Sequence, residues 1–536
     1  MKITFLPKNI NFDFTSGMTV LQAASACGIE IDGNCSGAGT CGKCKVKVLS
    51  ENSDKTDEVE RRSLTEKENK GNFRLACRYK PSCDLIVEVP MADGAANRKT
   101  KLIDLPDWFM SKENDGKGYG IAFDIGTTTV VAMFWDMENV ELMDIKAVTN
   151  PQSVFGADVI SRIMYAGDNP ANLAVIHKKI VDCLNVLLEE FAEKHNINKE
   201  DISEITVVGN TTMSHLFAGV DPSTLATAPF TPVFLASKRG LARDFGIMAG
   251  KDTSLYLLPN IAGHVGSDIT AGILATNIMN ENKNNLFVDI GTNGEIVLSA
   301  KGRKLTCSTA AGPAFEGATI YQGMRAASGA IERVTIQKDD VDIVVIDGLK
   351  PIGICGSGII DAVAQLVKNK IIDKTGKYAK PENLPEHGCS ENIVKRLRTN
   401  QRWKEFVLSY VDDGDDIVIT QKDVREVQLA KAAIYAGIKI LMKELGVEGP
   451  DLDKVSIAGA FGSYIDKESA LTIGLLPDIS IEKIVSVGNA AGVGASLALF
   501  SEDLQNAAEK IASGIEHLEL ADYEGFQDEY LSAMSF

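Results

Sequence analysis

Alternating apolar and polar positions open the chain and predict β-strands. Residues 2–15 contain two short alternating runs around residues 7–9, a pattern that predicts a β-hairpin. Apolar positions at helical spacing follow within residues 19–27, and the apolar run at 85–89 predicts a further strand. With a cysteine-containing loop between helix and last strand, residues 1–90 are expected to form a small β-grasp unit.

The next segment has no periodic pattern. Residues 91–117 mix Gly, Asn, Lys and Asp around one apolar patch, which holds Leu105, Trp108 and Phe109. Such a composition is typical of a linker, and we expect the patch to dock it locally.

A weak internal repeat organises the remainder. Residues 120–130 read GIAFDIGTTTV and residues 286–297 read LFVDIGTNGEIV, about 165 residues further on. Each copy predicts a buried strand, an Asp-Ile-Gly-Thr turn and a second strand. Gly-rich turns and helical stretches alternate with strands around them, which indicates α/β architecture. We therefore expect two similar lobes, residues 118–284 and 285–536.

The charge and the apolar content of the chain exclude some classes of function. The 536 residues hold 55 Lys and Arg against 73 Asp and Glu, a net charge of −18, so most of the surface would repel a phosphate backbone. Nucleic acid is therefore not expected as a partner. No run of about 18 apolar residues predicts a membrane span, and the N-terminus does not resemble a secretion signal. These features predict a cytoplasmic protein.

Four cysteines near the N-terminus have the pattern of a metal centre. Cys35, Cys41 and Cys44 form a C-x5-C-x2-C run, and Cys77 follows after 32 residues. Four thiolates are the ligands that a [2Fe–2S] cluster requires. Small residues surround the first three, so the loop can wrap a cluster closely and direct backbone N–H groups at its sulfurs.

A zinc site is the alternative for these cysteines. Zinc usually takes two C-x2-C pairs or mixed Cys and His ligands, and this segment has one such pair and no nearby His. The iron–sulfur interpretation is favoured, and the spacing resembles that of ferredoxins of the adrenodoxin and putidaredoxin kind. Cys27 falls on a predicted helix face with core residues, and Cys83 follows a Pro-Ser turn with no assigned role. Either of them could replace a ligand.

The two Asp-Ile-Gly-Thr turns carry the chemistry of a phosphate site. A Gly lets the backbone approach an anion, Thr hydroxyls and N–H groups bind phosphate oxygens, and a carboxylate at a strand end can hold Mg²⁺ or its waters. Two such turns are far more specific than one. The candidate residues are Asp124, Gly126, Thr127, Thr128, Asp289, Gly291, Thr292, Asn293, Gly294 and Glu295.

A third motif strengthens this interpretation. Residues 455–464 read VSIAGAFGSY, a strand followed by a Gly-rich turn and a helical segment. Together with the two turns, it resembles the superfamily of actin, sugar kinases and Hsp70, called ASKHA. The resemblance implies two RNase H-like lobes with ATP in the cleft, and Asp124 and Asp289 facing each other across Mg-phosphate as catalytic residues. It places the adenosine side at Gly459, Ala460, Phe461 and Gly462.

Nearly the whole chain resembles the reductive activators of corrinoid proteins. The resemblance rests on the order of ferredoxin, linker and ATPase, and on the motifs NPQSVFGADVISRI (150–163), GNTTMSHL (209–216), AGPAFEG (311–317) and CGSGII (355–360). It implies that one electron passes from a [2Fe–2S] cluster, held by the four cysteines, to Co(II) of a corrinoid protein. ATP would drive this transfer, which restores Co(I) for methyl transfer.

The same resemblance implies partners. A corrinoid protein of a methyltransferase system would accept the electron, a reductase or ferredoxin would supply it, and a homodimer stays open. Two other functions also remain open at this point. One is a redox-sensing small-molecule kinase of the ASKHA superfamily, and the other is a nucleotide-gated module that binds a corrinoid protein without reducing it.

Overall fold

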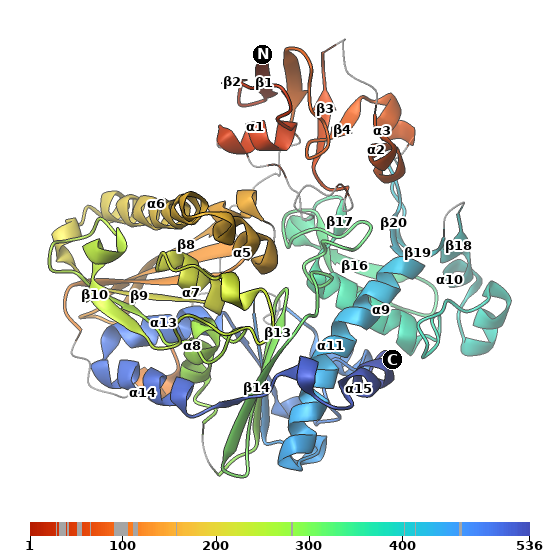
Figure 1. The fold of residues 1–536 in the computed structure, drawn as a ribbon. Coiled ribbons are helices and arrows are strands. Elements are labelled where there is room, and N and C mark those ends of the chain that lie inside the picture. The colour runs from red at the N-terminus through yellow and green to blue at the C-terminus, as the bar shows by residue number, and fades with distance from the viewer. Residues whose placement is uncertain are drawn as a thin grey trace.

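The computed structural model describes most of the chain. The described residues are 1–27, 29, 31, 39, 42–50, 56–64, 66–89, 105–110, 116–156, 158–279, 282–400, 403–412, 414–459 and 464–536. Within these ranges, none of the helices combines the length and the apolar character that crossing a bilayer requires. Figure 1 shows a small N-terminal unit above two larger lobes.

The N-terminal unit is a five-stranded sheet in the order β2-β1-β5-β3-β4. Its elements are β1 (Lys2–Leu6), β2 (Ile10–Asp13), α1 (Val20–Ala26), β3 (Lys45–Val48), α2 (Glu58–Ser63), α3 (Glu66–Lys70), β4 (Phe73–Leu75) and β5 (Leu85–Glu88). β1 pairs antiparallel with β2 and parallel with β5, and α1 packs on their core. The predicted β-grasp unit is confirmed, and β3 and β4 are strands that the sequence pattern did not indicate.

A six-stranded sheet in the order β10-β11-β9-β6-β7-β8 forms the centre of the first lobe. Its strands are β6 (Tyr119–Ile125), β7 (Thr129–Asp136), β8 (Glu141–Thr149), β9 (Ile202–Gly209), β10 (Lys238–Leu241) and β11 (Ser254–Leu257). Its helices are α5 (Val159–Asp168), α6 (Pro170–His195), α7 (Thr211–Phe217) and α8 (Ser267–Thr276).

The second lobe repeats this topology with the sheet order β22-β21-β12-β13-β14-β23. Its strands are β12 (Asn285–Ile290), β13 (Gly294–Ala300), β14 (Arg303–Thr309), β21 (Lys454–Ala458), β22 (Ile484–Gly488) and β23 (Glu516–His517). In both sheets, an antiparallel meander is followed by two strands parallel to its first strand. Two copies of this RNase H-like arrangement confirm the predicted pair of lobes.

The second lobe carries an additional subdomain between β14 and α11. It consists of β15 (Ala330–Ile336), β16 (Val341–Val345), β17 (Gly353–Ile354), α9 (Gly356–Lys368), α10 (Glu391–Arg396), β18 (Leu397–Thr399), β19 (Lys404–Ser409) and β20 (Ile417–Thr420). Its strands form two three-stranded sheets. Figure 1 shows the subdomain next to the N-terminal unit.

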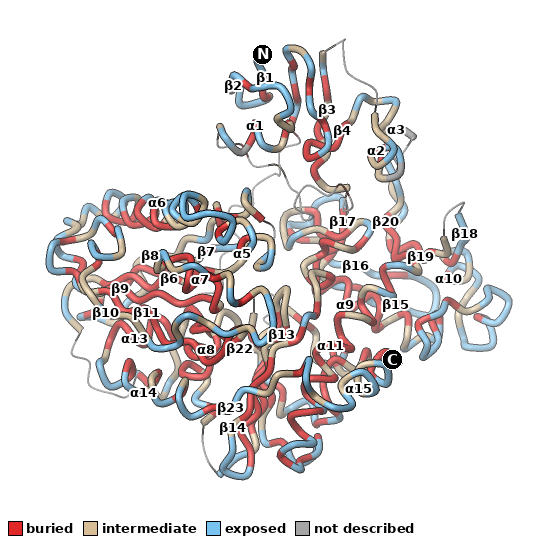
Figure 2. Tube along the Cα trace, in the orientation of Figure 1, coloured by how far each residue is buried: buried red, intermediate tan, exposed pale blue. Residues whose placement is uncertain are grey.

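The long helix α11 (Gln421–Leu445) connects this subdomain to the second sheet. It begins at Thr420, whose side chain accepts a hydrogen bond from the Asp423 amide, and it ends at Gly446 in a left-handed conformation. The helices α12 (Lys467–Thr472) and α15 (Phe526–Ser532) complete the lobe. Figure 2 shows the buried residues concentrated along the central strands of both sheets and along the helices that cover them.

The chain returns to the first lobe near its C-terminus. Helices α13 (Ala490–Phe500) and α14 (Glu502–Ser513) follow the last parallel strand of the second sheet, and α13 lies against the first sheet. The Thr206 hydroxyl donates to the Ala495 carbonyl at 2.7 Å, and the Trp135 indole N–H donates to the Ser496 hydroxyl at 2.9 Å. These bonds join α13, which follows the last parallel strand of the second sheet, to strands of the first sheet.

Part of the predicted linker is described. The short helix α4 (Asp107–Met110) buries Phe109, whose ring centroid lies 5.3 Å from that of Phe500 in α13. Leu105 and Trp108 pack against the same cluster. The apolar patch therefore docks on the first lobe, as expected, while residues 90–104 and 111–115 lie outside the described residues.

Candidate nucleotide cleft and cluster site

The two Asp-Ile-Gly-Thr turns have related backbone geometry. After β6, the Gly126 amide donates to the Thr129 carbonyl at 2.9 Å; after β12, the Gly291 amide donates to the Asn293 carbonyl at 2.9 Å. A Cβ atom at Gly126 would lie 2.7 Å from the Thr129 oxygen, so the first turn excludes a side chain there. The connections are equally long, but the strand pairing differs by one residue, because Ile125 pairs with Val130 whereas Ile290 pairs with Gly294.

Three polar side chains hold the first turn, and each comes from a motif outside it. Asn150 donates to the Gly126 carbonyl at 2.8 Å, and the buried Arg162 donates to the Thr127 carbonyl at 2.6 Å. Asn210, at the start of α7, donates to the Thr127 hydroxyl at 2.9 Å. The motifs at 150–163 and 209–216 therefore position the first Asp-Ile-Gly-Thr turn.

A single carboxylate holds the second turn. The Thr292 hydroxyl donates to the carboxylate of Glu316, which belongs to the motif at 311–317. Ser308 in β14 donates to Glu295 at 3.4 Å. Burial raises the pKa of Glu316, and the hydrogen bond from the Thr292 hydroxyl opposes this shift by stabilising the ionised carboxylate. The motif at 311–317 is therefore part of the support of the second turn.

The carboxyl ends of the two sheets meet at Asp124 and Asn489. Asn489 follows β22 of the second sheet and starts α13, and its side-chain amide donates to the Asp124 carboxylate at 2.9 Å. Gly459 follows β21 with φ of +96°, and a Cβ atom there would lie 2.9 Å from an Asp289 carboxylate oxygen. The candidate residues Asp124, Asp289 and Gly459 thus lie close together where the two lobes meet, a region called the cleft below, and Ala460, Phe461 and Gly462 lie outside the described residues.

Acidic side chains crowd this cleft and raise one another's pKa. Burial raises the pKa of Asp124 to about 6, and burial together with Asp124 raises the pKa of Asp289 to about 7. Burial and then the charges of Asp289 and Asp124 raise the pKa of Asp268 to about 8. The pKa of Glu295 is raised by burial and by Asp268 and Asp289. Carboxylates in this state are stabilised by a cation.

Asp268 lies near the candidate residues Asp124 and Asp289, and the sequence did not single it out. It lies in the first turn of α8, just after the Gly266 cap. The available signal was the segment GHVGSDIT, a Gly-rich turn that leads into a helix, but similar turns occur elsewhere in the chain. Only the fold places this turn beside Asp124 and Asp289.

Oxygen ligands of this kind fit Mg²⁺. Among the described side chains, no group of three or more His, Cys, Asp or Glu is arranged to hold a metal ion without other ligands. Mg²⁺ is usually bound in proteins by one or two carboxylates together with water and substrate phosphates. Asp124 and Asp289 are oxygen donors of the kind that fits this mode of Mg²⁺ binding.

The described half of the cysteine site fits an iron–sulfur cluster. Cys44 precedes β3, Cys77 follows β4, and both are buried. The Cys77 amide donates to the Cys44 sulfur at 3.5 Å, which is the kind of N–H contact that stabilises a thiolate ligand. Gly39 and Gly42 have φ of +77° and +63°, so left-handed backbone curves the loop here. Cys35 and Cys41 lie outside the described residues.

Cys27 differs from a cluster ligand. Its thiol donates to the Ala23 and Ala24 carbonyls at 3.2 and 3.3 Å, and burial raises its pKa. Both features favour the protonated thiol, whereas a cluster ligand is a thiolate. The geometry supports the interpretation of Cys27 as a helix-terminal core residue.

Three family models match consecutive parts of the chain. A 2Fe-2S iron–sulfur cluster binding domain matches residues 3–82, so the N-terminal unit is a [2Fe–2S] ferredoxin domain. The RACo middle region matches residues 119–281, and the C-terminal domain of RACo, described as the ASKHA domain, matches residues 283–536.

Relatives with stated activities match most of the chain. The corrinoid activation enzyme RamQ of Eubacterium limosum is 40% identical over 439 residues, which is 80% of this chain and 72% of RamQ. The [Co(II) methylated amine-specific corrinoid protein] reductase of Methanosarcina barkeri is 28% identical over 458 residues, covering 78% and 77% of the two chains. A solved structure of a reductive activator for corrinoid, iron–sulfur protein matches with a TM-score of 0.69 at 32% identity, over 100% of this chain and 98% of the other.

Proposed function

Because the chain belongs to the RACo family of corrinoid-protein activators, we propose that it uses ATP to reduce the Co(II) of a corrinoid protein to Co(I). The observation that supports this most directly is the union of two sites in one chain. A ferredoxin domain, in which the Cys77 amide donates to the Cys44 sulfur, is joined to two lobes that bring the acidic residues Asp124 and Asp289 together.

The cleft is proposed to bind MgATP between the two turns. The backbone N–H groups and hydroxyls of the two turns would bind the phosphates, and Asp124 and Asp289 would hold Mg²⁺ or its waters from opposite lobes. Gly459, which packs closely against Ile290 and Asp289, is proposed to lie on the adenosine side together with Ala460, Phe461 and Gly462. The proposed phosphate residues are Gly126, Thr127, Thr128, Gly291, Thr292, Asn293, Gly294 and Glu295.

The cluster is proposed to be held by Cys35, Cys41, Cys44 and Cys77. It supplies a one-electron carrier with a potential of roughly −400 mV when it is of the plant type. Co(II) of a partner protein is the electron acceptor. Moving one electron uphill by a further 100 mV costs about 2.3 kcal/mol, and this is the scale that nucleotide binding has to provide. It can do so by favouring one conformation of the cleft over another.

The partners follow from this chemistry. A corrinoid protein of a methyltransferase system would receive the electron, and a reductase or another ferredoxin would reload the cluster. A cytoplasmic location and a homodimer remain predictions.

The decisive experiment mixes the reduced protein, MgATP and a Co(II) corrinoid protein under anaerobic conditions. We expect the Co(I) absorption band to grow only when cluster and MgATP are both present. The Cys41→Ser variant and a non-hydrolysable ATP analogue serve as controls. Co(I) formation that is equally fast without nucleotide would overturn the proposal, and phosphorylation of an added small molecule would favour the kinase alternative.

A further inference from the structure

Lys43 joins the cysteine loop of the ferredoxin domain to the second lobe. It precedes Cys44 in the sequence, and its ammonium group donates hydrogen bonds to the carbonyl oxygens of Ile320, at 3.3 Å, and of Gly323. Both acceptors lie in residues 316–324, which lead from β14 into the additional subdomain. Figure 1 shows the ferredoxin domain above this part of the second lobe.

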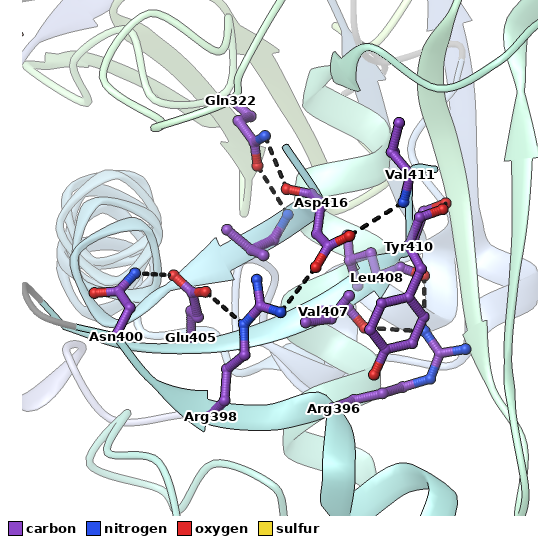
Figure 3. Close-up of polar contacts among 12 residues, drawn as sticks. Gln322, Arg396, Arg398, Asn400, Glu405, Val407, Leu408, Tyr410, Val411 and Asp416 are labelled. Atoms are coloured by element: carbon purple, nitrogen blue, oxygen red, sulfur yellow. Dashed lines mark hydrogen bonds and ion pairs between the residues drawn. The ribbon is translucent and has the colours of Figure 1, made fainter. Parts of the chain in front are cut away.

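The acceptor segment is anchored to the subdomain. Between the two acceptors, the Gln322 side chain donates to the Asp416 carbonyl at 3.0 Å (Figure 3). It also accepts from the Val418 amide at 2.8 Å. Asp416 is held in turn by Arg398, whose guanidinium donates to its carboxylate at 2.8 Å. The Tyr321 amide donates to Asp423 at the start of α11, at 2.7 Å. The segment whose carbonyls bind Lys43 is therefore hydrogen-bonded to the subdomain and to the start of α11.

The same segment is also tied to the second phosphate turn. Its first residue, Glu316, accepts the hydrogen bond from the Thr292 hydroxyl. The next residue, Gly317, touches Gly323 so closely that a Cβ atom on Gly323 would lie 2.2 Å from the Gly317 oxygen. A continuous series of contacts thus runs from the second Asp-Ile-Gly-Thr turn to Lys43, which directly precedes the proposed cluster ligand Cys44.

We propose that Lys43 is a positioning residue that docks the ferredoxin domain on residues 316–324, and that nucleotide in the cleft weakens this docking. The inference rests on the proposed function, because it requires phosphate at the second turn. A phosphate oxygen would compete for the Thr292 hydroxyl and release Glu316, which shifts the segment that Lys43 binds. Undocking then frees the edge of the cysteine loop for an acceptor protein.

Thermodynamic linkage makes the proposal testable by binding alone. If nucleotide weakens docking, then loss of docking must strengthen nucleotide binding by the same factor. Lys43→Gln removes the ammonium group, whereas Lys43→Arg keeps a cation that can donate to two carbonyls. Lys47→Gln is the matched control, because Lys47 lies in the same domain and contacts Glu88 of that domain at 3.9 Å.

The experiment uses the full chain with its cluster and titrates each variant with a non-hydrolysable ATP analogue and Mg²⁺ by calorimetry. We expect Lys43→Gln to bind the analogue at least about fivefold more tightly than the wild type, the lower end of typical coupling factors. Lys43→Arg and Lys47→Gln should stay close to the wild type. A merely destabilised variant would not gain affinity.

Hydrogen exchange of the peptide covering residues 318–324 provides a second readout. The analogue should accelerate its exchange in the wild type, and in Lys43→Gln exchange should already be fast without nucleotide. The proposal is wrong if Lys43→Gln matches Lys47→Gln in both affinity and exchange while the wild type still binds nucleotide and reduces Co(II). If the wild type neither binds nucleotide nor reduces Co(II), the proposed function itself fails.

Discussion

The side-chain amide of Asn489 donates a hydrogen bond to the carboxylate of Asp124 at 2.9 Å. The two residues are 365 positions apart; Asp124 lies near the end of β6 in the first sheet, and Asn489 directly follows β22 of the second. Asn489 also caps α13, where its side chain accepts from the Gly492 amide at 2.7 Å. One residue therefore orients a proposed magnesium carboxylate and fixes the helix that joins the two lobes.

Asn489→Ala is expected to weaken MgATP binding by about tenfold, because loss of one hydrogen bond to a charged group costs about 1.5–3 kcal/mol. The lost helix cap should also lower the free energy of unfolding by about 1 kcal/mol. Calorimetric titration and thermal unfolding measure the two effects. Asn169→Ala, which removes the cap of α6, is the control for the cap alone. Equal nucleotide affinities in the two variants would contradict the role of Asn489 in the cleft.

The acidic cleft predicts that the magnesium-free protein loses stability as pH rises. Asp124, Asp268 and Asp289 have folded-state pKa values of about 6, 8 and 7, above the ordinary 3.8. The folded state therefore binds more protons than the unfolded state between pH 4 and 8, and the free energy of unfolding falls across this window.

Thermal unfolding between pH 5.5 and 8.5, with and without Mg²⁺ and nucleotide, measures this dependence. Each kcal/mol lost should lower Tm by about 2–4 °C for a lobe of this size. Asp268→Asn removes one of the three charges and should flatten the magnesium-free curve. A curve for this variant that is as steep as that of the wild type would argue against mutual repulsion in the cleft.

Gly459→Ala should damage both stability and nucleotide binding. With φ of +96°, a Cβ atom at this position would lie 2.4 Å from the Ile290 carbonyl oxygen and 2.9 Å from Asp289. Backbone movement is then unavoidable, and we expect a cost of about 1–3 kcal/mol with at least tenfold weaker MgATP binding. Gly525→Ala is the matched control, since it has φ of +89° but no neighbouring atom within 4 Å. Its nucleotide affinity should equal that of the wild type.

The ferredoxin domain depends on a buried ion pair between Glu60 and Arg74. The two side chains are 1% and 6% exposed, with a nitrogen–oxygen distance of 2.8 Å. Glu60→Gln leaves the guanidinium without its counter-charge, which should cost about 3–5 kcal/mol. The temperature at which the visible absorbance of the cluster is lost measures the stability of the domain. Glu88→Gln, at an exposed pair, should change it little, and basal ATP hydrolysis should survive in both variants.

Substitution distinguishes the proposed cluster ligands from the nearby Cys27. Cys77→Ser should lose most of the iron and the visible spectrum of a [2Fe–2S] centre, because Cys77 is one of four proposed ligands. Cys27→Ser should keep both, since its thiol donates to backbone carbonyls. Iron analysis and electron paramagnetic resonance of the reduced protein measure the outcome. Iron loss in Cys27→Ser alone would reassign the ligand set.

The local sequence pattern was sufficient to predict some structural features of this protein. The strand, Asp-Ile-Gly-Thr turn and second strand are contiguous in each copy, so the repeat predicted both hairpins and hence both lobes. The cysteine spacing likewise predicted a [2Fe–2S] site, which the family match over residues 3–82 confirms. In both cases the chemistry lies within a short stretch of chain.

Other features needed the tertiary structure, because they arise where distant segments pack together. Asp268 becomes part of the cleft only because α8 starts beside the ends of two strands from different lobes. Asn489 reaches Asp124 because α13 leaves the second sheet and packs on the first. Lys43 finds its carbonyl partners 277 and 280 residues away. The sequence alone determined which turns and ligands exist, and packing between distant elements decided which of them face one another.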